Sequence, residues 1–290
     1  MEPISYLQSI ILGVIQGIAE PFPISSLGHS VVIPQVFGWN IHQNADYFLS
    51  FLVATHCATA LVLFIFFWED WKRILRGLWY SVRSGFRTDP ADPDAKLGWL
   101  LVVGTIPAGI LGFALEHPLR TLFASAEVAA IFLAVNGLLL LGFERLRRRA
   151  PEPDDWKGDS DPRIARTMSF KQAAAIGTAQ AAALIPGISR SGMAMGGGLL
   201  TGLSNEDAAR FSFLLATPII GAAGVLKLPE LMGSAGNGVR GQALVGAIAA
   251  GITTWFAVRF LLRFFRSNRL TPFGIYCLIV GVILTIAFAL

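Results

Sequence analysis

Two short polar sequences lie inside apolar stretches of the chain, and their residue types suit phosphate chemistry. The first, QGIAEPFPISSLGHS, carries Glu20, Ser26 and His29. The second, PGISRSG, carries Arg190. A guanidinium group flanked by hydroxyls and backbone N–H groups suits the oxygens of a phosphate. Histidine and glutamate can move protons, and an activated serine hydroxyl can attack phosphorus. Together these residues predict a phosphoryl-transfer site.

Each residue of the two sequences receives a predicted role from its chemistry. The predicted catalytic residues are Glu20, Ser26, His29 and Arg190. The predicted substrate-binding residues carry amide, hydroxyl or guanidinium groups, and they are Gln16, Ser25, Ser189, Arg190 and Ser191. Whether Ser26 attacks phosphorus directly or orients a water molecule is left open. His56 and Gln180 also lie in apolar stretches, and we interpret them as packing or supporting residues.

Glu20 and Arg190 are isolated charges. Glu20 is the only Asp, Glu, Lys or Arg between Glu2 and Asp46, and Arg190 is the only one between Lys171 and Glu206. A lone ionisable group at membrane depth is costly and by default marks a functional site, usually with a partner. The alternative is a mutual salt bridge that only pins two segments together, although buried pairs are weak stabilising devices.

The composition requires that these residues sit in a membrane protein. Of the 290 residues, 54% are hydrophobic and only 14% are charged, whereas soluble domains carry about 25% charged residues. A soluble protein of this size could not hide so much apolar surface. The formal net charge of +4 comes from basic residues clustered in a few loops, which excludes a nucleic-acid footprint. We therefore predict an all-α polytopic membrane protein and exclude a soluble enzyme.

Six apolar runs are long enough to cross about 30 Å of hydrocarbon. They lie at about 46–68, 97–116, 126–143, 210–227, 242–262 and 273–290. Of the 23 lysines and arginines, 18 fall in three segments, 69–96, 144–171 and 259–270. Basic loops remain in the cytoplasm, so both termini and the 21–45 segment are predicted to face outside.

Two further features concern disulfide bonds and the processing of the N-terminus. Cys57 and Cys277 both fall in apolar stretches, so no disulfide framework is expected. The N-terminus lacks the positive region of a cleavable signal peptide, so we expect the first apolar stretch to stay in the mature protein.

The segments 4–38 and 172–203 do not fit as simple spans. The orientation of the six runs requires each to enter the membrane and return to the same side. Both contain Pro, Gly and Ser in their middles, and broken backbone at membrane depth is tolerated only when buried in protein or lining a cavity. We predict two re-entrant helical hairpins. The alternative is a pair of short helices lying flat on the surface.

These two segments also resemble each other without a gap. Residues 5–30 align with 169–194 at a constant offset, and the aligned identities include Ser5/Ser169, Gln16/Gln180 and Ser25/Ser189. One copy enters from outside and the other from inside, so we predict an inverted-topology repeat, in which the site lies where the broken elements meet. Residues 16–30 and 180–194 should face each other. The single domain, 1–290, then divides into repeats of about 1–143 and 169–290, with cytoplasmic loops at about 69–96 and 144–171.

These motifs resemble a known family. Gln16-x-x-x-Glu20 followed by PISSLGH, together with PGISRSG and FSFLLATP, is similar to the bacterial undecaprenyl-diphosphate phosphatases of the bacitracin-resistance type. The resemblance covers nearly the whole chain. It implies a hydrolase that converts the polyprenyl lipid undecaprenyl diphosphate to undecaprenyl phosphate, recycling the carrier lipid for peptidoglycan and other wall polymers.

The resemblance also implies how the site is built and where it lies. Gln16 and Glu20 would be the paired amide and carboxylate positions, Ser25, Ser26 and His29 the catalytic loop, and Ser189 and Arg190 the phosphate binders. A divalent cation, Mg²⁺ or Ca²⁺, would be the cofactor, with Glu20 as its ligand. The protein would span the bacterial plasma membrane, with its site open to the outer face. A homodimer is compatible with this interpretation, and no nucleic-acid partner is expected.

Three positions depart from the pattern of the family. Gln16 stands where many members have Glu, which removes one metal ligand. Leu27 and Ala194 each replace a common Thr, so two hydroxyls that could contact phosphate are lost. Lower activity or a shifted substrate preference is compatible with these changes.

Two other functions compete with hydrolysis. A transporter or flippase for a lipid phosphate would suit an inverted repeat with broken helices, and it would need Arg190 to hold an anion. It would not need a nucleophile and a base, so the cluster of Glu20, Ser26 and His29 favours an enzyme. A structural scaffold would leave the buried Glu20 and Arg190 unexplained.

Overall fold

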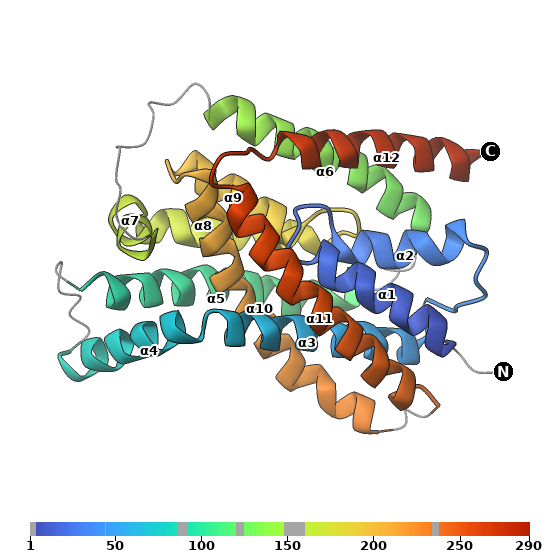
Figure 1. The fold of residues 1–290 in the computed structure, drawn as a ribbon, viewed down its shortest axis with the longest axis horizontal. Coiled ribbons are helices and arrows are strands. Elements are labelled where there is room, and N and C mark those ends of the chain that lie inside the picture. Colours follow the sequence, from blue (N-terminus) through green and yellow to red (C-terminus); the bar gives the residue numbers. More distant parts are fainter. Residues whose placement is uncertain (1–3, 44, 86–91, 120–124, 148–159, 234–237) are drawn as a thin grey trace.

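A computed structural model describes residues 4–43, 45–85, 92–119, 125–147, 160–233 and 238–290. Over these ranges the chain forms helices and no strands (Figure 1). In chain order the helices are α1 Tyr6–Ala19, α2 Ser26–Val36, α3 Asp46–Phe66, α4 Trp68–Arg83, α5 Pro93–Leu119, α6 Ala126–Arg147, α7 Ser160–Thr167, α8 Phe170–Gln180, the short 3₁₀ helix η2 Ala181–Leu184, α9 Arg190–Leu200, α10 Asn205–Met232, α11 Arg240–Phe264 and α12 Thr271–Ala289.

Six of the described helices are long and apolar enough to cross a membrane. Their apolar parts are Asp46–Phe66, Pro93–Leu115, Ala126–Arg147, Asn205–Val225, Arg240–Phe264 and Thr271–Ala289. Each coincides with one of the six predicted runs, so this prediction is confirmed. The chain is a multi-pass, all-α membrane protein. Its main core includes fully buried residues of α3, α5, α9 and α10, among them Leu63, Leu100, Ala194 and Phe211.

The predicted loop 69–96 contains a helix, α4, that the sequence analysis did not assign. Trp71, Ile74 and Gly77 are buried at helical spacing, while Trp79 and Tyr80 on another face are exposed. Apolar residues every three to four positions with charges between them are typical of an amphipathic helix. The density of basic residues in this segment obscured that period.

The predicted loop 144–171 likewise contains α7, which ion pairs hold in place. Asp161 is almost completely buried and accepts hydrogen bonds from Arg73 of α4 at 2.7 Å and from Arg210 of α10 at 2.6 Å. Arg163 pairs with the buried Asp207 of α10. A buried carboxylate needs such partners, so these pairs fasten α7 to the spans.

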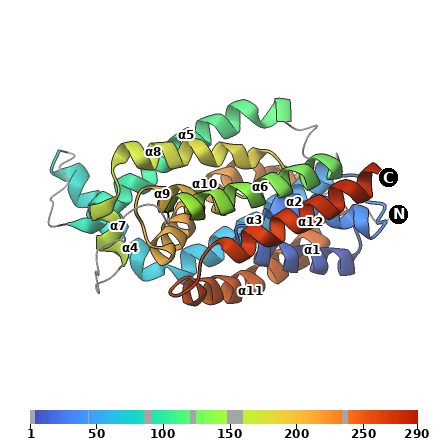
Figure 2. The same cartoon turned by 90° about the horizontal axis from the view of Figure 1, so that it is seen from above.

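Segments that were predicted to lie on opposite sides of the membrane lie at opposite ends of the molecule. Figures 1 and 2 show both termini at one end of the helix bundle and α4 and α7 at the other. The link between α2 and α3 lies at the same end as the termini. This arrangement is compatible with the predicted topology.

The orientation in the membrane is a prediction that cysteine labelling can check. Both native cysteines, Cys57 and Cys277, are free and would first be replaced by alanine. In intact cells, a membrane-impermeant maleimide should label Gln35→Cys and should not label Ser84→Cys until the cells are permeabilised. Both positions are exposed. Labelling of position 84 from outside would contradict the assignment of the basic loops to the cytoplasm.

The two predicted hairpins each fold as helix, break and helix, with the same capping residues. Ser5 and Gln8 form a capping box at the start of α1, and Ser169 and Gln172 form one at the start of α8. After the breaks, Ser25 caps α2 and Ser189 caps α9 in the same way, each accepting from the N–H three residues later. The correspondence of the caps is compatible with the predicted repeat.

Close helix packing is found at corresponding glycines of the two segments. A Cβ atom added to Gly13 of α1 would lie 2.2 Å from the carbonyl oxygen of Gly246 in α11. One added to Gly177 of α8 would lie 2.1 Å from the carbonyl oxygen of Gly104 in α5. Small residues let membrane helices approach this closely, so each hairpin packs through a glycine against a long span.

This packing predicts a strong position dependence for glycine substitutions. Gly177→Ala should lower the free energy of unfolding by about 1–3 kcal/mol, because its methyl group collides with the backbone of α5. Gly142→Ala in α6 meets open space and should be neutral or stabilising by up to about 1 kcal/mol. Thermal unfolding in one detergent checks both variants. Equal melting temperatures for the two would show that α8 and α5 are not packed this closely.

Candidate active site

The two broken segments meet through hydrogen bonds between their loops. The Ser25 hydroxyl accepts from the backbone N–H of Gly187 at 3.2 Å, and the Ser191 hydroxyl donates to the carbonyl oxygen of Phe22 at 2.9 Å. These contacts join residues more than 160 positions apart in the chain. The prediction that 16–30 and 180–194 face each other is confirmed.

Asn136 of α6 bonds to both loops and is not among the site residues predicted from the sequence. Its side-chain oxygen accepts from the Ser189 N–H at 3.0 Å, and its amide nitrogen donates to the carbonyl oxygen of Pro23 at 3.0 Å. Asn136 is buried. It is the only Asn, Gln, Asp, Glu, Lys or Arg in the apolar run 128–143, and that isolation was the available signal.

Glu20 lies at the centre of the site and pairs with Arg190. The helix α1 ends just before Glu20, where Pro21 follows and cannot continue it. Arg190, the first residue of α9, donates from Nε at 3.2 Å and from Nη2 at 3.0 Å to Glu20 Oε1. The Glu20 side chain is only 6% exposed and that of Arg190 14%. The two isolated charges are therefore mutual partners.

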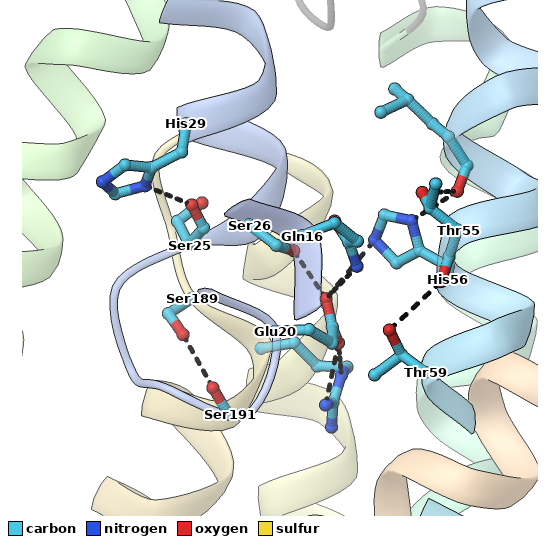
Figure 3. A network of polar contacts seen from close by, with 12 residues as sticks. Gln16, Glu20, Ser25, Ser26, His29, Thr55, His56, Thr59, Ser189 and Ser191 are labelled. Atoms are coloured by element: carbon cyan, nitrogen blue, oxygen red, sulfur yellow. Dashed lines mark hydrogen bonds and ion pairs between the residues drawn. The ribbon is translucent and has the colours of Figure 1, made fainter. Parts of the chain in front are cut away.

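Ser26 lies against the other oxygen of the same carboxylate. Its hydroxyl donates to Glu20 Oε2 at 2.5 Å, and the Gln16 amide donates to that oxygen at 3.3 Å (Figure 3). Gln16 lies one helical turn before Glu20 on α1, and Ser26 begins α2. The break at Pro21 and Pro23 turns the chain back, which brings a residue six positions later onto the carboxylate.

His29 lies apart from these groups. Its Nδ1 is 2.7 Å from the carbonyl oxygen of Ser25, and its Nε2 is 2.8 Å from the hydroxyl of Tyr276 in α12. Figure 3 shows its ring directed away from Glu20. The structure therefore does not bring His29 to the carboxylate, and its predicted catalytic role stays a prediction.

The three predicted phosphate-binding serines make contacts within the protein. Ser25 accepts from Gly28 and Gly187, and its φ of +67° is unusual for a residue with a side chain. Ser189 accepts from the Gly192 N–H at 3.0 Å and lies 3.0 Å from the Ser191 hydroxyl. These hydroxyls shape the two loops, and substrate contacts by them stay a prediction.

His56 and Gln180, which we interpreted as packing or supporting residues, both line the site. His56 Nε2 lies 3.3 Å from Glu20 Oε2. Gln180, at the end of α8, faces the same cavity. The register of the repeat, which pairs Gln180 with Gln16, was the signal that could have placed Gln180 in the site.

A cavity of about 400 Å³ opens beside these groups. Its polar end is lined by Glu20, Ser26, His56 and Arg190. The rest of its wall is mostly apolar, and much of it comes from α5, η2 and α10, including Ala108, Gly109, Gly112, Phe113, Ile219 and Ala222. A polar end that continues into an apolar chamber suits an amphiphilic ligand with an anionic head group.

Two buried polar atoms near Glu20 have no hydrogen-bond partner among the residues that the structure describes. They are Nη1 of Arg190, which lines the cavity, and Oε1 of Gln16, which does not. Buried polar atoms without partners are rare in folded proteins, and a ligand can satisfy them. The free guanidinium N–H suits a phosphate oxygen.

The residues that the structure describes do not form a metal site by themselves. Within the described ranges, no group of three or more His, Cys, Asp or Glu side chains could hold a metal ion. Among the described residues, Glu20 is the one carboxylate lining the cavity, and both of its oxygens already face donors. A divalent cation prefers several free oxygen ligands, so Glu20 as placed here does not fit the predicted metal ligand.

These features define a polytopic helical membrane protein in which a buried Glu20–Arg190 pair lies where two loops meet. The chain belongs to the family described as bacitracin resistance protein BacA, which it matches over residues 9–283. The resemblance seen in the sequence motifs is confirmed.

Relatives in this family cover nearly all of the chain. It is 47% identical to an undecaprenyl-diphosphatase of Mycolicibacterium paratuberculosis, over 96% of this chain and 95% of that protein. It is 45% identical to an undecaprenyl-diphosphatase of Granulibacter bethesdensis, over 97% and 96%. It is 42% identical to undecaprenyl-diphosphatase 2 of Frankia alni, over the full length of both chains.

Proposed function

We propose that this protein is an undecaprenyl-diphosphatase, a hydrolase that converts undecaprenyl diphosphate to undecaprenyl phosphate and inorganic phosphate. Its family and its relatives support this activity. The product is the carrier lipid for peptidoglycan synthesis, and the family description links the protein to bacitracin resistance.

One observation carries the proposal: a serine hydroxyl donates to a buried carboxylate that also binds an arginine. Ser26 lies 2.5 Å from Glu20 Oε2, and Arg190 holds Oε1. A hydroxyl is a weak nucleophile until an adjacent base takes its proton. Glu20 is placed to be that base, and Arg190 is placed to hold phosphate with its remaining N–H groups.

The reaction follows from this geometry in two steps. The Ser26 oxygen forms a bond to the terminal phosphorus as the bond from that phosphorus to the bridging oxygen breaks, and the hydroxyl proton moves to Glu20. Undecaprenyl phosphate leaves with the bridging oxygen. Water then attacks the phosphoserine, its oxygen and protons enter inorganic phosphate, and Glu20 returns the proton to the serine oxygen.

Transport of a lipid phosphate is the less favoured function. A transporter would use Arg190 to hold the anion but would not need a serine hydroxyl aimed at a buried carboxylate. The hydrogen bond from Ser26 to Glu20 therefore favours the hydrolase.

The proposal also includes a divalent cation, which the substrate and not the protein alone would hold. Because both Glu20 oxygens face donors, we propose that Mg²⁺ or Ca²⁺ enters on the diphosphate oxygens, as Mg²⁺ commonly does with substrate phosphates. No step above is assigned to the cation.

The site is proposed to open to the outer face of the bacterial plasma membrane. The clustering of basic residues supports this orientation.

A homodimer also stays a proposal, and light scattering of the purified protein in detergent would test it.

Phosphate release from undecaprenyl diphosphate by the purified protein tests the proposed function. We expect release by the full-length protein, loss of release with a chelator, and recovery when Mg²⁺ or Ca²⁺ is added back. Binding of the lipid without any release would contradict the hydrolase and favour transport. Full activity in the presence of chelator would support the hydrolase and would contradict the need for a divalent cation.

A further inference from the structure

His56 faces the same carboxylate oxygen as Ser26. Its Nε2 lies 3.3 Å from Glu20 Oε2, and the Ser26 oxygen lies 2.5 Å from that atom (Figure 3). His56 belongs to α3, whereas Glu20 follows α1 and Ser26 begins α2. The imidazole therefore reaches the carboxylate from a third helix.

The other side of the imidazole ring is fixed by the backbone. His56 Nδ1 lies 2.8 Å from the carbonyl oxygen of Leu52, one turn earlier on α3. A carbonyl oxygen only accepts, so Nδ1 carries a hydrogen. Nε2 lies at ion-pair distance from Glu20 Oε2, and an ionised carboxylate only accepts, so Nε2 donates to Glu20 when the imidazole is protonated. In that form the ring donates on both sides.

The donors around Glu20 divide between its two oxygens. Arg190 binds Oε1, while Gln16, Ser26 and His56 meet at Oε2. When the Ser26 oxygen attacks phosphorus it moves away from Oε2 and leaves its proton there, and the Gln16 bond is long at 3.3 Å. His56 on α3 then remains to hold Oε2 in place.

We propose that His56 is a positioning residue for the hydrolysis: its Nε2–H holds Glu20 Oε2 where that oxygen accepts the Ser26 proton. The proposal rests on the proposed function. Glu20 touches the reacting hydroxyl, and His56 acts through Glu20.

Two substitutions of His56 distinguish a positioning role from a packing role. His56→Leu removes the donor and keeps a similar volume, and we expect kcat to fall about 10- to 100-fold, the range for losing one hydrogen bond to a charged group, with KM within about threefold. His56→Gln restores an N–H donor, and we expect kcat to return to within about fivefold of wild type. Phosphate release from undecaprenyl diphosphate and thermal unfolding in detergent are measured on each.

The control is His42→Gln, at an exposed histidine outside the site, which should behave as wild type. A wild-type kcat in His56→Leu would overturn the positioning role, and so would a His56→Gln variant that stays folded but is as slow as His56→Leu. A wild-type protein that releases no phosphate would instead refute the proposed function itself.

Gln180 is a second residue whose surroundings point to a ligand. It is 3% exposed and lines the cavity. Neither its Nε2 nor its Oε1 finds a hydrogen-bond partner within the described part of the chain. A buried amide without partners destabilises the fold, so its retention in a cavity points to a ligand that satisfies it.

The same cavity shows which ligand chemistry fits this amide. Arg190 also lines the cavity, and its buried Nη1 likewise finds no hydrogen-bond partner among the described residues. Phosphate oxygens accept from both an amide N–H and a guanidinium N–H. We infer that Gln180 binds the diphosphate group of the substrate, which extends the proposed function by one binding residue.

Gln180→Leu tests this inference because it removes the amide and keeps its approximate size. We expect KM to rise about 10-fold, with kcat within about threefold and a melting temperature equal to or above that of wild type. Removing an unsatisfied buried amide should not weaken the fold. A structural glutamine would give the reverse: a lower melting temperature and an unchanged KM.

Gln172→Leu on the same helix is the matched control. It breaks the capping box at Ser169, so its melting temperature should fall by about 2–4 °C while KM stays unchanged. An unchanged KM in Gln180→Leu would overturn the inference, whereas absence of hydrolysis in the wild type would refute the proposed function.

Discussion

Ser26→Ala is expected to abolish phosphate release from undecaprenyl diphosphate while lipid binding persists. Loss of a nucleophile costs about 10³-fold or more in kcat. Binding should persist because Arg190 and the loop N–H groups that hold the diphosphate remain. Both quantities should be measured on one preparation, with binding followed by a fluorescent lipid diphosphate and release by a phosphate assay.

The control for this variant is Ser30→Ala, one turn further along α2. Ser30 is buried but does not line the cavity, so its variant should keep near wild-type turnover. A simple transporter predicts that Ser26→Ala is tolerated. Retained hydrolysis in Ser26→Ala would exclude Ser26 as the nucleophile and point to a water molecule activated by Glu20.

Arg190→Lys is expected to lower kcat/KM about ten- to a hundredfold. Lysine keeps the positive charge but loses the planar fork, so it cannot hold Glu20 Oε1 through two N–H groups and also offer a third to phosphate. Loss of one charge-assisted contact corresponds to about 1.5–3 kcal/mol. Steady-state kinetics check the loss.

Thermal unfolding separates a weakened phosphate contact from a weakened fold. Arg266→Lys serves as the control because Arg266 is an exposed partner of Glu206, and exposed pairs contribute little. Arg266→Lys should match wild type in steady-state kinetics and in thermal unfolding. Near wild-type turnover in Arg190→Lys would show that the arginine only joins the two loops and does not bind substrate.

Sequence alone could predict the six spans because long apolar runs and clustered basic residues are local signals. It could also mark Glu20 and Arg190, since each is the lone charge of its segment, but their mutual salt bridge was considered only as the alternative to a functional site, and the structure shows that the pair forms. Local signals could not show α4, whose apolar period is masked by its arginines.

Contacts between distant helices account for the parts of the site that were missed. Asn136 joins the loops from α6, His56 reaches Glu20 from α3, and Tyr276 of α12 binds His29. Each depends on how helices far apart in the chain cross. Ser25 has a positive φ, and its hydroxyl accepts from Gly187, which comes 162 residues later. No local propensity reports such a contact.

The pairing of Glu20 with Arg190 has a consequence for biosynthesis. The two residues are 170 positions apart, so a ribosome must add more than half of the chain after Glu20 before its partner exists. During that interval the described donors to Glu20 that have been synthesised are Gln16, Ser26 and His56, and all three meet Glu20 Oε2. Oxygen Oε1 gains its partner only with the second segment, so the site is completed late in synthesis.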